Sequence, residues 1–438
     1  MKKALLLFFA MLLTTAGFAQ GVIALFSRSE EFFSLMNEQK FKEAQAYFDT
    51  VAQKQTTPEK LGEIWGSLTS NLGKFTSLDL VQSSVQGDYY YVAADGNFEK
   101  ATQGFTLIFN KGQKLVGLRP RERAVESEYQ IPSYADTTLF KQIEVHVKTP
   151  GHDLVGLLTI PKNGSNFPLV VFVHGSGPSD MDETVGPNKP FKDIAGGLAS
   201  KGIASIRYVK RTVLYANEFT TSFTVKEEVM DDALAAIALA RTTPNIDKGQ
   251  IYVFGHSIGG MLAPRLALLA PDLNGIILAA APARKLADII ADQNKYGASL
   301  AKDTTGLVAK QLTEALKKVD AARITSLGTM KADSVVLGLP AAYWVDLNNY
   351  NQVEDAKKLG KQRILVIQGG LDFQVSEQDF NIWNTALSTK KNASMKLYPD
   401  LNHLLSPQNE KGTMSQYQVP INVSAVLVND LVTWINSN

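Results

Sequence analysis

From about residue 138 onward, apolar strand-like runs alternate with helical segments, and this pattern constrains the fold more than any other feature of the chain. The strand-like runs include PLVVFVHGSG, IYVFGHS, GIILAAAP, RILVIQGG and SMKLYP, and VSAVLVNDLVTWINS is typical of a closing helix. Strands that are apolar along their whole length are typical of parallel sheets covered on both faces. The pattern therefore predicts an α/β fold with a doubly wound, mostly parallel sheet, led by an antiparallel hairpin in QIEVHVKT and DLVGLLTIP.

A helical segment interrupts this alternation between about residues 283 and 358. The segment follows the strand-like run GIILAAAP, and open α/β sheets bind ligands at the carboxyl ends of their strands. We therefore interpret residues 283–358 as a helical cap insertion over a site; the alternative is a decoration that only packs against the sheet. Tyr343 and Trp344 in this insertion could line an apolar acyl pocket, although such aromatic residues more commonly pack a core.

A region of different character, residues 28–120, precedes the alternating pattern. Apolar residues recur at near-helical spacing in EEFFSLMNEQKFKEAQAYFDTV, and Pro58 preceded by Thr57 predicts the start of another helix. Two strand-like runs follow, YYYVAADGNFEK and TQGFTLIFNKGQKLVGLRP, and NKGQK within the second predicts a hairpin turn. Helices followed by strands predict a small α+β domain.

The first residues have the features of an export signal. Lys2 and Lys3 form a positive segment, residues 4–13 are an unbroken apolar run, and small residues that suit a cleavage enzyme follow. The run is too short to span a bilayer, which needs about 20 apolar residues. We therefore expect residues 1–19 to be a signal peptide, no membrane span, and an exported mature protein, periplasmic or secreted. A buried N-terminal helix is the alternative.

Composition narrows the classes of function. The chain has 438 residues, which suggests two or three domains at roughly 100 to 200 residues each. Its net charge is +1, so neither a nucleic-acid partner nor binding to an anionic membrane surface is indicated. No clustered metal ligands and no Gly-x-Gly-x-x-Gly after a strand occur, so no metal or organic cofactor is implied. The chain has no cysteine, and nothing in the sequence indicates an oligomeric state.

The segment IYVFGHSIGG places Ser257 between an apolar strand and an apolar helix. Gly255 to Gly259 fit Gly-x-Ser-x-Gly, in which the serine occupies a strained turn and small neighbours let strand and helix approach closely. A glycine-rich turn without chemistry is the alternative, but the strand before the motif and the helix after it favour a nucleophile. We predict Ser257 as the nucleophile and the Ile258 amide as one donor to the oxyanion.

A serine nucleophile needs a base, and one of the five histidines suits that role. The other four lie in or beside the leading hairpin, begin the HGSGP turn or adjoin the serine on its tight turn; they are His146, His152, His174 and His256. His403, in YPDLNHLL, follows the last strand and lies C-terminal to the nucleophile, where a base is wanted. We predict His403 as the base; a polar surface residue in a loop is the alternative.

The acid that orients the base should follow another strand. The segment RILVIQGGLDFQVS ends a strongly apolar run with two glycines and then gives Asp372. Asp379, in the following helix, and Asp400, in the same loop as the base, compete with it, and a turn or helix-cap role is the alternative for Asp372. We predict Asp372, because it lies at the carboxyl end of a strand.

The HGSGP turn, upstream of the serine, follows the strand-like run PLVVFV. Backbone N–H groups in such a turn can face the Ile258 amide across a developing oxyanion. We predict that Ser176 supplies the second oxyanion donor from its backbone amide; a simple glycine turn is the alternative.

Several motifs in a fixed order resemble those of a known family. The order Ser257, Asp372, His403 and the segments FVHGSGP, RYVKR, VFGHSIGGMLAPRLA, VIQGGLDFQV and LNHLL resemble the α/β-hydrolases. Within that superfamily, residues 138–438 are similar to exported bacterial esterases also likened to dienelactone hydrolases and serine aminopeptidases. The similar family segment usually has an acidic residue where Val209 stands. Residues 28–118 resemble a small domain of unknown function often found ahead of such hydrolases.

The resemblance and the triad imply a serine esterase with a small-molecule acyl ester as its substrate. An aminopeptidase or amidase of the same fold is an alternative, and it would need carboxylates for the substrate amine. The insertion has acids such as Asp288, Asp292 and Glu314, but no dense acidic cluster. A non-catalytic binding protein is the third possibility, because a fold alone does not establish an activity.

Overall fold

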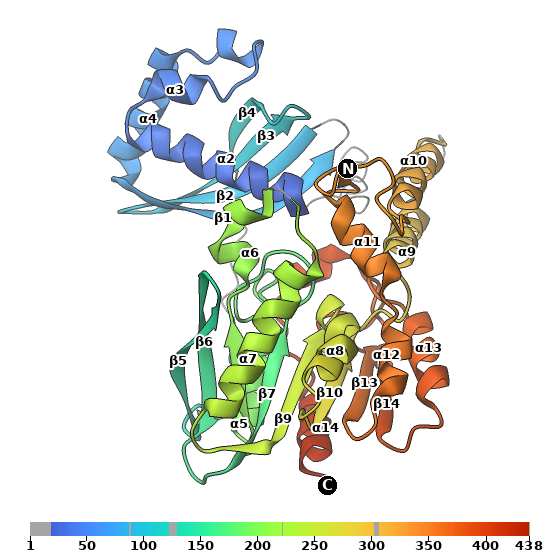
Figure 1. Ribbon diagram of the computed structural model, residues 1–438. Coiled ribbons are helices and arrows are strands. Elements are labelled where there is room, and N and C mark those ends of the chain that lie inside the picture. The colour runs from blue at the N-terminus through green and yellow to red at the C-terminus, as the bar shows by residue number, and fades with distance from the viewer. Residues whose placement is uncertain (1–18, 87–88, 122–128, 221, 302–305, 438) are drawn as a thin grey trace. The chain divides into compact units, whose positions relative to one another are not determined.

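The computed structural model describes residues 19–86, 89–121, 129–220, 222–301 and 306–437 (Figure 1). The chain divides into two compact units, Met1–Glu126 and Ser127–Asn438. Residues 1–18, nearly all of the predicted signal peptide, lie outside the described residues. None of the helices in the described ranges combines the length and apolar character that crossing a bilayer requires.

The N-terminal unit packs helices against an antiparallel sheet with the strand order β1-β2-β3-β4. Its elements are α2 (Ala19–Asn37), α3 (Phe41–Gln45), the 3-10 helix η2 (Ala52–Lys54), α4 (Pro58–Leu72), β1 (Phe75–Gln86), β2 (Tyr89–Phe98), β3 (Thr102–Asn110) and β4 (Leu115–Arg121). The Thr57 hydroxyl accepts from the Lys60 amide at 3.3 Å and Pro58 opens α4, which confirms the predicted helix start. Aromatic rings of helices and strands fill the core, with Phe33 edge-on to Trp65.

The C-terminal unit is built on a sheet whose described strands run in the order β14-β13-β10-β9-β7-β8-β6-β5. These strands are β5 (Phe140–Thr149), β6 (His152–Pro161), β7 (Phe167–Val173), β8 (Ala204–Tyr208), β9 (Ile246–His256), β10 (Gly275–Ala279), β13 (Arg363–Gly369) and β14 (Ala393–Tyr398). From β8 to β14 the neighbours pair in parallel, and the hairpin β5–β6 joins β8 in antiparallel fashion. The predicted mostly parallel sheet and leading hairpin are confirmed.

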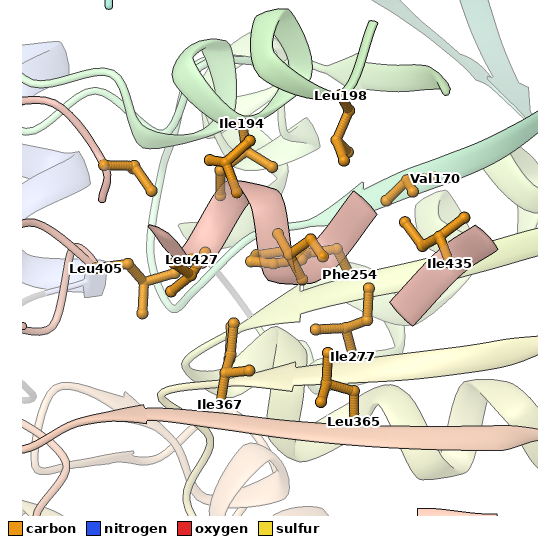
Figure 2. Close-up of a cluster of buried hydrophobic side chains, with 14 of the residues drawn as sticks. Val170, Ile194, Leu198, Phe254, Ile277, Leu365, Ile367, Leu405, Leu427 and Ile435 are labelled. Atoms are coloured by element: carbon orange, nitrogen blue, oxygen red, sulfur yellow. The ribbon is translucent and has the colours of Figure 1, made fainter. Parts of the chain in front are cut away.

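Helices cover both faces of this sheet, because the side chains of each strand alternate between the faces. Helices α5 (Pro190–Ala199) and α14 (Ala425–Asn436) pack on one face, and α7 (Asp231–Thr242) and α8 (Ile258–Leu269) cover the other (Figure 1). Figure 2 shows the apolar core under α5 and α14, where strand residues meet helix residues; those labelled include Val170, Phe254, Ile277, Ile367, Ile194, Leu198, Leu427 and Ile435. Shorter or peripheral elements complete the unit: α6 (Arg211–Leu214), η3 (Ala216–Thr220), η4 (Lys226–Met230), α13 (Glu377–Leu387) and η5 (Met414–Gln418).

The insertion predicted for residues 283–358 falls between β10 and β13. Its elements are α9 (Leu286–Ser299), α10 (Leu307–Ala321), β11 (Val335–Val336), β12 (Leu339–Pro340), α11 (Ala341–Asn349) and α12 (Gln352–Lys358). The helical character is confirmed, and β11 and β12 add a short antiparallel ribbon that the sequence did not predict. Tyr343 and Trp344 of α11 are fully buried, and the Trp344 indole donates to the Val336 carbonyl at 2.6 Å. Both side chains therefore pack inside the protein, as the commoner of the two expectations had it.

Candidate active site

Ser257 occupies the turn between strand β9 and helix α8 and adopts a backbone conformation that L-residues rarely take. Its φ is 53° and its ψ is −118°. The Ser257 amide donates to the Ala279 carbonyl of β10 at 2.9 Å, so the turn is tied to the neighbouring parallel strand. A strained non-glycine residue at the carboxyl end of a strand is the kind of backbone that functional sites retain.

The glycines around Ser257 are required by close backbone approach. A Cβ on Gly255 would collide with the Gly259 carbonyl, and a Cβ on Gly259 would collide with the Val173 carbonyl of β7. At Gly260 an added Cβ would lie 2.7 Å from the Ala281 side chain. The motif therefore has glycine at these positions because α8 packs closely against β7, β9 and the segment after β10.

His403 and Asp372 come together as the sequence predicts. The Nδ1 nitrogen of His403 lies 2.7 Å from Oδ2 of Asp372, and both side chains are buried. Because the carboxylate accepts this hydrogen bond, the proton sits on Nδ1, and Nε2 is left as the basic atom of the ring. The His403 ring also lies 4.7 Å, between centroids, from the ring of His256, which directly precedes Ser257.

The Asp372 carboxylate is fixed by other partners. Its Oδ1 accepts from the amides of Gln374 at 2.8 Å and Val375 at 2.9 Å, and its Oδ2 accepts from Gln368 Nε2 at 3.0 Å. Both oxygens are therefore occupied, and the carboxylate has little freedom to turn away from His403. The two competing acids are placed elsewhere.

Asp379 is buried in α13, where it accepts from the backbone amides of Ala283 and Arg284, at the start of the insertion, and pairs with the Arg284 guanidinium. Asp400 is exposed in the turn after β14. Neither acid contacts His403 through any hydrogen bond among the described residues.

The loops that carry Asp372 and His403 are tied to each other by backbone contacts. The Leu371 amide donates to the Leu401 carbonyl at 2.9 Å. A Cβ on Gly369 would collide with that same carbonyl, so the glycine that ends β13 is what lets the two loops touch. The apolar strand followed by two glycines thus sets the distance between acid and base.

The HGSGP turn lies against the nucleophile. A Cβ built on Gly175 would lie 3.4 Å from the Ser257 Cβ. The Gly175 amide donates to Oε1 of Glu183 at 2.6 Å, and the Gly177 amide donates to Oε1 of Glu228 at 2.8 Å. Two buried carboxylates therefore hold the amides on either side of Ser176.

The two predicted oxyanion donors are amides that these hydrogen bonds do not use. The Ser176 amide has no acceptor within the described chain, and Ser176 is exposed. Ile258 is the first residue of α8, where amides have no partner in the helix. Both predicted donors lie near Ser257: Ser176 follows Gly175, which lies against the serine, and Ile258 is its chain neighbour.

His256, which we do not predict as the base, makes two buried contacts that the sequence does not indicate. Its Nδ1 lies 2.9 Å from Glu183 Oε2, and its Nε2 donates to the His403 carbonyl at 2.8 Å. Burial acts to lower the pKa of His256, but Glu183, the His403 carbonyl and Asp372 outweigh burial and raise this pKa above its ordinary value. Both ring nitrogens of His256 therefore face acceptors, and the ring joins Glu183 to the backbone of the predicted base.

The side chains of the remaining histidines contact residues outside the triad. His146 pairs with Asp153 at 2.7 Å and His152 pairs with Glu218 at 2.6 Å, both in the leading hairpin region. His174 is buried among apolar rings, and burial is the main cause that lowers its pKa to about 4. Among the described residues, no group of three or more His, Cys, Asp or Glu is arranged to hold a metal ion.

Comparison with known proteins gives matches over both units. Residues 220–411 match the family described as serine aminopeptidase S33, and residues 29–118 match a family described as a protein of unknown function, DUF3887. Over 404 residues the chain is 34% identical to Esterase EstD of Thermotoga maritima, an alignment that spans 92% of this chain and 93% of that protein.

Solved structures with a similar chain course include two esterases. Est1E from Butyrivibrio proteoclasticus is 15% identical, with a TM-score of 0.42, over 67% of this chain and 98% of that one. The esterase domain from a Rhodothermus marinus protein is 15% identical, with a TM-score of 0.40, over 67% of this chain and 97% of that one.

Proposed function

Because the chain belongs to the α/β-hydrolase family and is a homologue of an esterase, we propose that it cleaves carboxylic esters through an acyl-enzyme on Ser257. The observation that carries this proposal is the 2.7 Å hydrogen bond between buried Asp372 and His403, in loops beside the strained turn of Ser257. A serine on such a turn, with a histidine whose tautomer is fixed, is what nucleophilic acyl transfer needs.

In the proposed reaction, the Ser257 hydroxyl attacks the ester carbonyl carbon while Nε2 of His403 takes the hydroxyl proton. Asp372 holds the tautomer and stabilises the imidazolium that forms. The imidazolium then gives its proton to the alcohol oxygen as the carbon–oxygen bond breaks, which leaves the acyl-enzyme. Water, deprotonated by His403, attacks the acyl carbon, releases the carboxylic acid and restores the serine.

The amides of Ser176 and Ile258 are proposed to stabilise the negative oxygen of the two tetrahedral intermediates. Charge on that oxygen develops only during the reaction, so donors fixed in advance lower the barrier more than they strengthen substrate binding. A single donor of this kind is worth about 10²- to 10³-fold in kcat. The carboxylates of Glu183 and Glu228, which hold the neighbouring amides, support this placement of the free Ser176 amide.

An aminopeptidase or amidase reaction at the same site is the second candidate, favoured by the match of residues 220–411 to a serine aminopeptidase family. A site for a substrate amine would need a free carboxylate. Three acids of the insertion are already paired: Asp288 with Arg323, Asp292 with Arg284, and Glu314 with Lys317. This pairing supports the ester reaction over the peptide reaction.

Steady-state hydrolysis distinguishes these functions. Wild type and Ser257→Ala would be assayed with p-nitrophenyl esters of increasing acyl length and with aminoacyl p-nitroanilides at equal concentration. The proposal predicts that wild type turns over esters faster than anilides and that Ser257→Ala loses the enzymatic rate. Faster turnover of anilides would replace the esterase proposal with the aminopeptidase one, and no turnover of either by wild type would contradict both.

Export is part of the proposal, supported by the charged and apolar pattern of residues 1–19. The mature protein would then act in the periplasm or outside the cell. Expression of the full chain in a Gram-negative host, followed by mass spectrometry of the periplasmic protein, should show an N-terminus near residue 20. Recovery of the intact chain in the cytoplasm alone would contradict export.

A further inference from the structure

A chain of buried polar contacts joins the insertion to the turn that holds Ser176. The Tyr343 hydroxyl, on helix α11, donates to Oε2 of Glu228 at 2.6 Å. The other oxygen of Glu228 accepts from the Gly177 amide at 2.8 Å and from Nζ of Lys210 at 2.9 Å. The Lys210 ammonium also donates to the Gly175 carbonyl at 2.8 Å, so it contacts the HGSGP turn at a second point.

All three side chains of this chain are removed from water. The exposed fractions are 1% for Tyr343, 3% for Glu228 and 2% for Lys210. Burial acts to raise the pKa of Glu228, but Lys210, Tyr343 and the Gly177 amide outweigh burial and hold this pKa below its ordinary value. The carboxylate is therefore ionised, and hydrogen bonds to an ionised acceptor are stronger than those between neutral groups.

The local backbone adds a second reason to connect Glu228 with function. Glu228 lies in η4, a single π-helical turn directly before α7. Such turns are rare and occur frequently at functional sites. Here the turn directs Glu228 at Gly177 and Tyr343 together.

We propose that Tyr343 is a positioning residue for the HGSGP turn, residues 174–178, here called the oxyanion turn, and that it acts through Glu228. The proposal rests on the esterase function proposed above and deepens it. The Tyr343 hydroxyl fixes one carboxylate oxygen, the other oxygen fixes the Gly177 amide, and the turn then presents the Ser176 amide to the oxyanion. In this account the insertion takes part in catalysis as the outer anchor of the oxyanion turn.

A looser turn should change kcat and KM differently. Substrate in the ground state gains little from the oxyanion donors, whereas the tetrahedral intermediate depends on them. Loosening the turn should therefore lower kcat and leave KM nearly unchanged. We expect about a tenfold loss, less than removal of a whole donor, because the amide is displaced and not deleted.

Tyr343→Phe is the informative variant. It removes one hydroxyl and keeps the ring, which packs edge-on against Phe223 at 5.7 Å between centroids. Tyr252→Phe is the matched control, because Tyr252 is equally buried but its hydroxyl donates to the Ile435 carbonyl, on the side of the sheet packed by α14. Both variants and wild type would be assayed for kcat and KM with p-nitrophenyl acetate and for inhibition by a short alkyl trifluoromethyl ketone, whose adduct bears an oxyanion.

The expected result is a tenfold lower kcat for Tyr343→Phe, with KM within about twofold of wild type and ketone inhibition weakened by the same factor as kcat. Tyr252→Phe should match wild type in all three quantities. A folded Tyr343→Phe with wild-type kcat, or with a loss only in KM, would overturn the proposal. If Tyr343→Phe does not fold, Glu228→Gln keeps the side-chain shape and weakens the hold on Gly177. Because it also leaves Lys210 uncompensated, its unfolding free energy would be measured beside kcat, and a folded Glu228→Gln with wild-type kcat would overturn the proposal.

A separate readout keeps this test independent of the esterase proposal. Wild type and both tyrosine variants would be treated with a fluorophosphonate, which labels an activated serine. Labelling of wild type with unchanged kcat in Tyr343→Phe refutes the role of Tyr343 alone. Absence of labelling in wild type refutes the proposed function, and with it the role of Tyr343 in that function.

Discussion

Glu183 and His256 form a buried ion pair, with 2.9 Å between Oε2 of the carboxylate and Nδ1 of the imidazole. Each partner also holds one side of the candidate site. Glu183 accepts from the Gly175 amide of the HGSGP turn at 2.6 Å, and His256 donates to the carbonyl of His403 at 2.8 Å. The pair therefore links the turn that would hold the oxyanion to the loop that carries the predicted base.

Glu183→Gln should destabilise the protein by about 3 kcal/mol, because removing one charge of a buried pair leaves its partner uncompensated. The effect should depend on pH. Burial acts to raise the pKa of Glu183, but His256 and its other partners outweigh burial and hold this pKa below its ordinary 4.5. The stabilisation from Glu183 is therefore lost as pH falls through the lowered pKa. The pKa of His256 is raised above 6.5, so its stabilisation is lost as pH rises through the raised pKa.

The difference in unfolding free energy between wild type and Glu183→Gln should therefore be largest between about pH 4.5 and 6.5 and smaller on either side. Urea unfolding across a pH series measures it. A difference that does not vary with pH would show that the two side chains are not a charged pair in the folded protein.

Asp372→Asn tests the acid without changing its shape. An amide cannot hold the Nδ1–H tautomer of His403 as a carboxylate does, so kcat with an acyl ester should fall about 10³- to 10⁴-fold. Asp379→Asn is the control for acid chemistry, because Asp379 binds Arg284 and the backbone of the insertion and not His403. Equal losses of kcat in the two folded variants would argue against Asp372 as the orienting acid.

Gly255→Ala should destabilise the fold by about 2 to 4 kcal/mol, because its Cβ would collide with the backbone carbonyl of Gly259, which cannot move without shifting α8. Gly360→Ala is the matched control: nothing lies within 4 Å of the added carbon, and its φ is not positive. Thermal unfolding compares the two. Equal stability of Gly255→Ala and wild type would mean that strand β9 and helix α8 are farther apart than described.

Burial of His174 should lower the free energy of unfolding in acid. Burial lowers its pKa from 6.5 to about 4, so the unfolded chain takes up this proton at a higher pH than the folded protein. Stability should therefore fall as pH drops from 6.5 toward 4, by about 3 kcal/mol from this residue, and level off below that. His174→Phe keeps a ring against Phe191 and Tyr208, and its unfolding free energy should lack this component. An acid slope as steep as that of wild type would contradict the assignment.

Much of the fold followed from local pattern. Continuous apolar strands alternating with helices predicted the parallel sheet, and Thr57 with Pro58 predicted a helix start that the structure confirms. Strand β1 was not predicted, because FTSLDLVQSSVQ is largely polar and gains its strand conformation by pairing with β2. The ribbon β11–β12 was missed because two-residue strands leave no periodicity to detect.

The candidate site was predictable only where chemistry and strand ends coincide. Ser257, Asp372 and His403 each follow an apolar strand or its turn, which is a local signal. Glu183, Glu228 and Lys210 carry no such signal, since their own segments are irregular or short helical turns and the buried pairs Lys210–Glu228 and Glu183–His256 form only when the chain folds. His256 was set aside as a base for a sound reason, but its pairing with Glu183 arises from tertiary packing.

Covalent labelling of Ser257 tests the central claim most directly. Wild type would be incubated with a fluorophosphonate, digested and mapped by tandem mass spectrometry, with Ser257→Ala and the exposed-serine variant Ser299→Ala treated in parallel. The account predicts one adduct, on the peptide that contains Ser257, in wild type and in Ser299→Ala, and none in Ser257→Ala. An unlabelled wild-type protein, or an adduct that persists in Ser257→Ala, would contradict it.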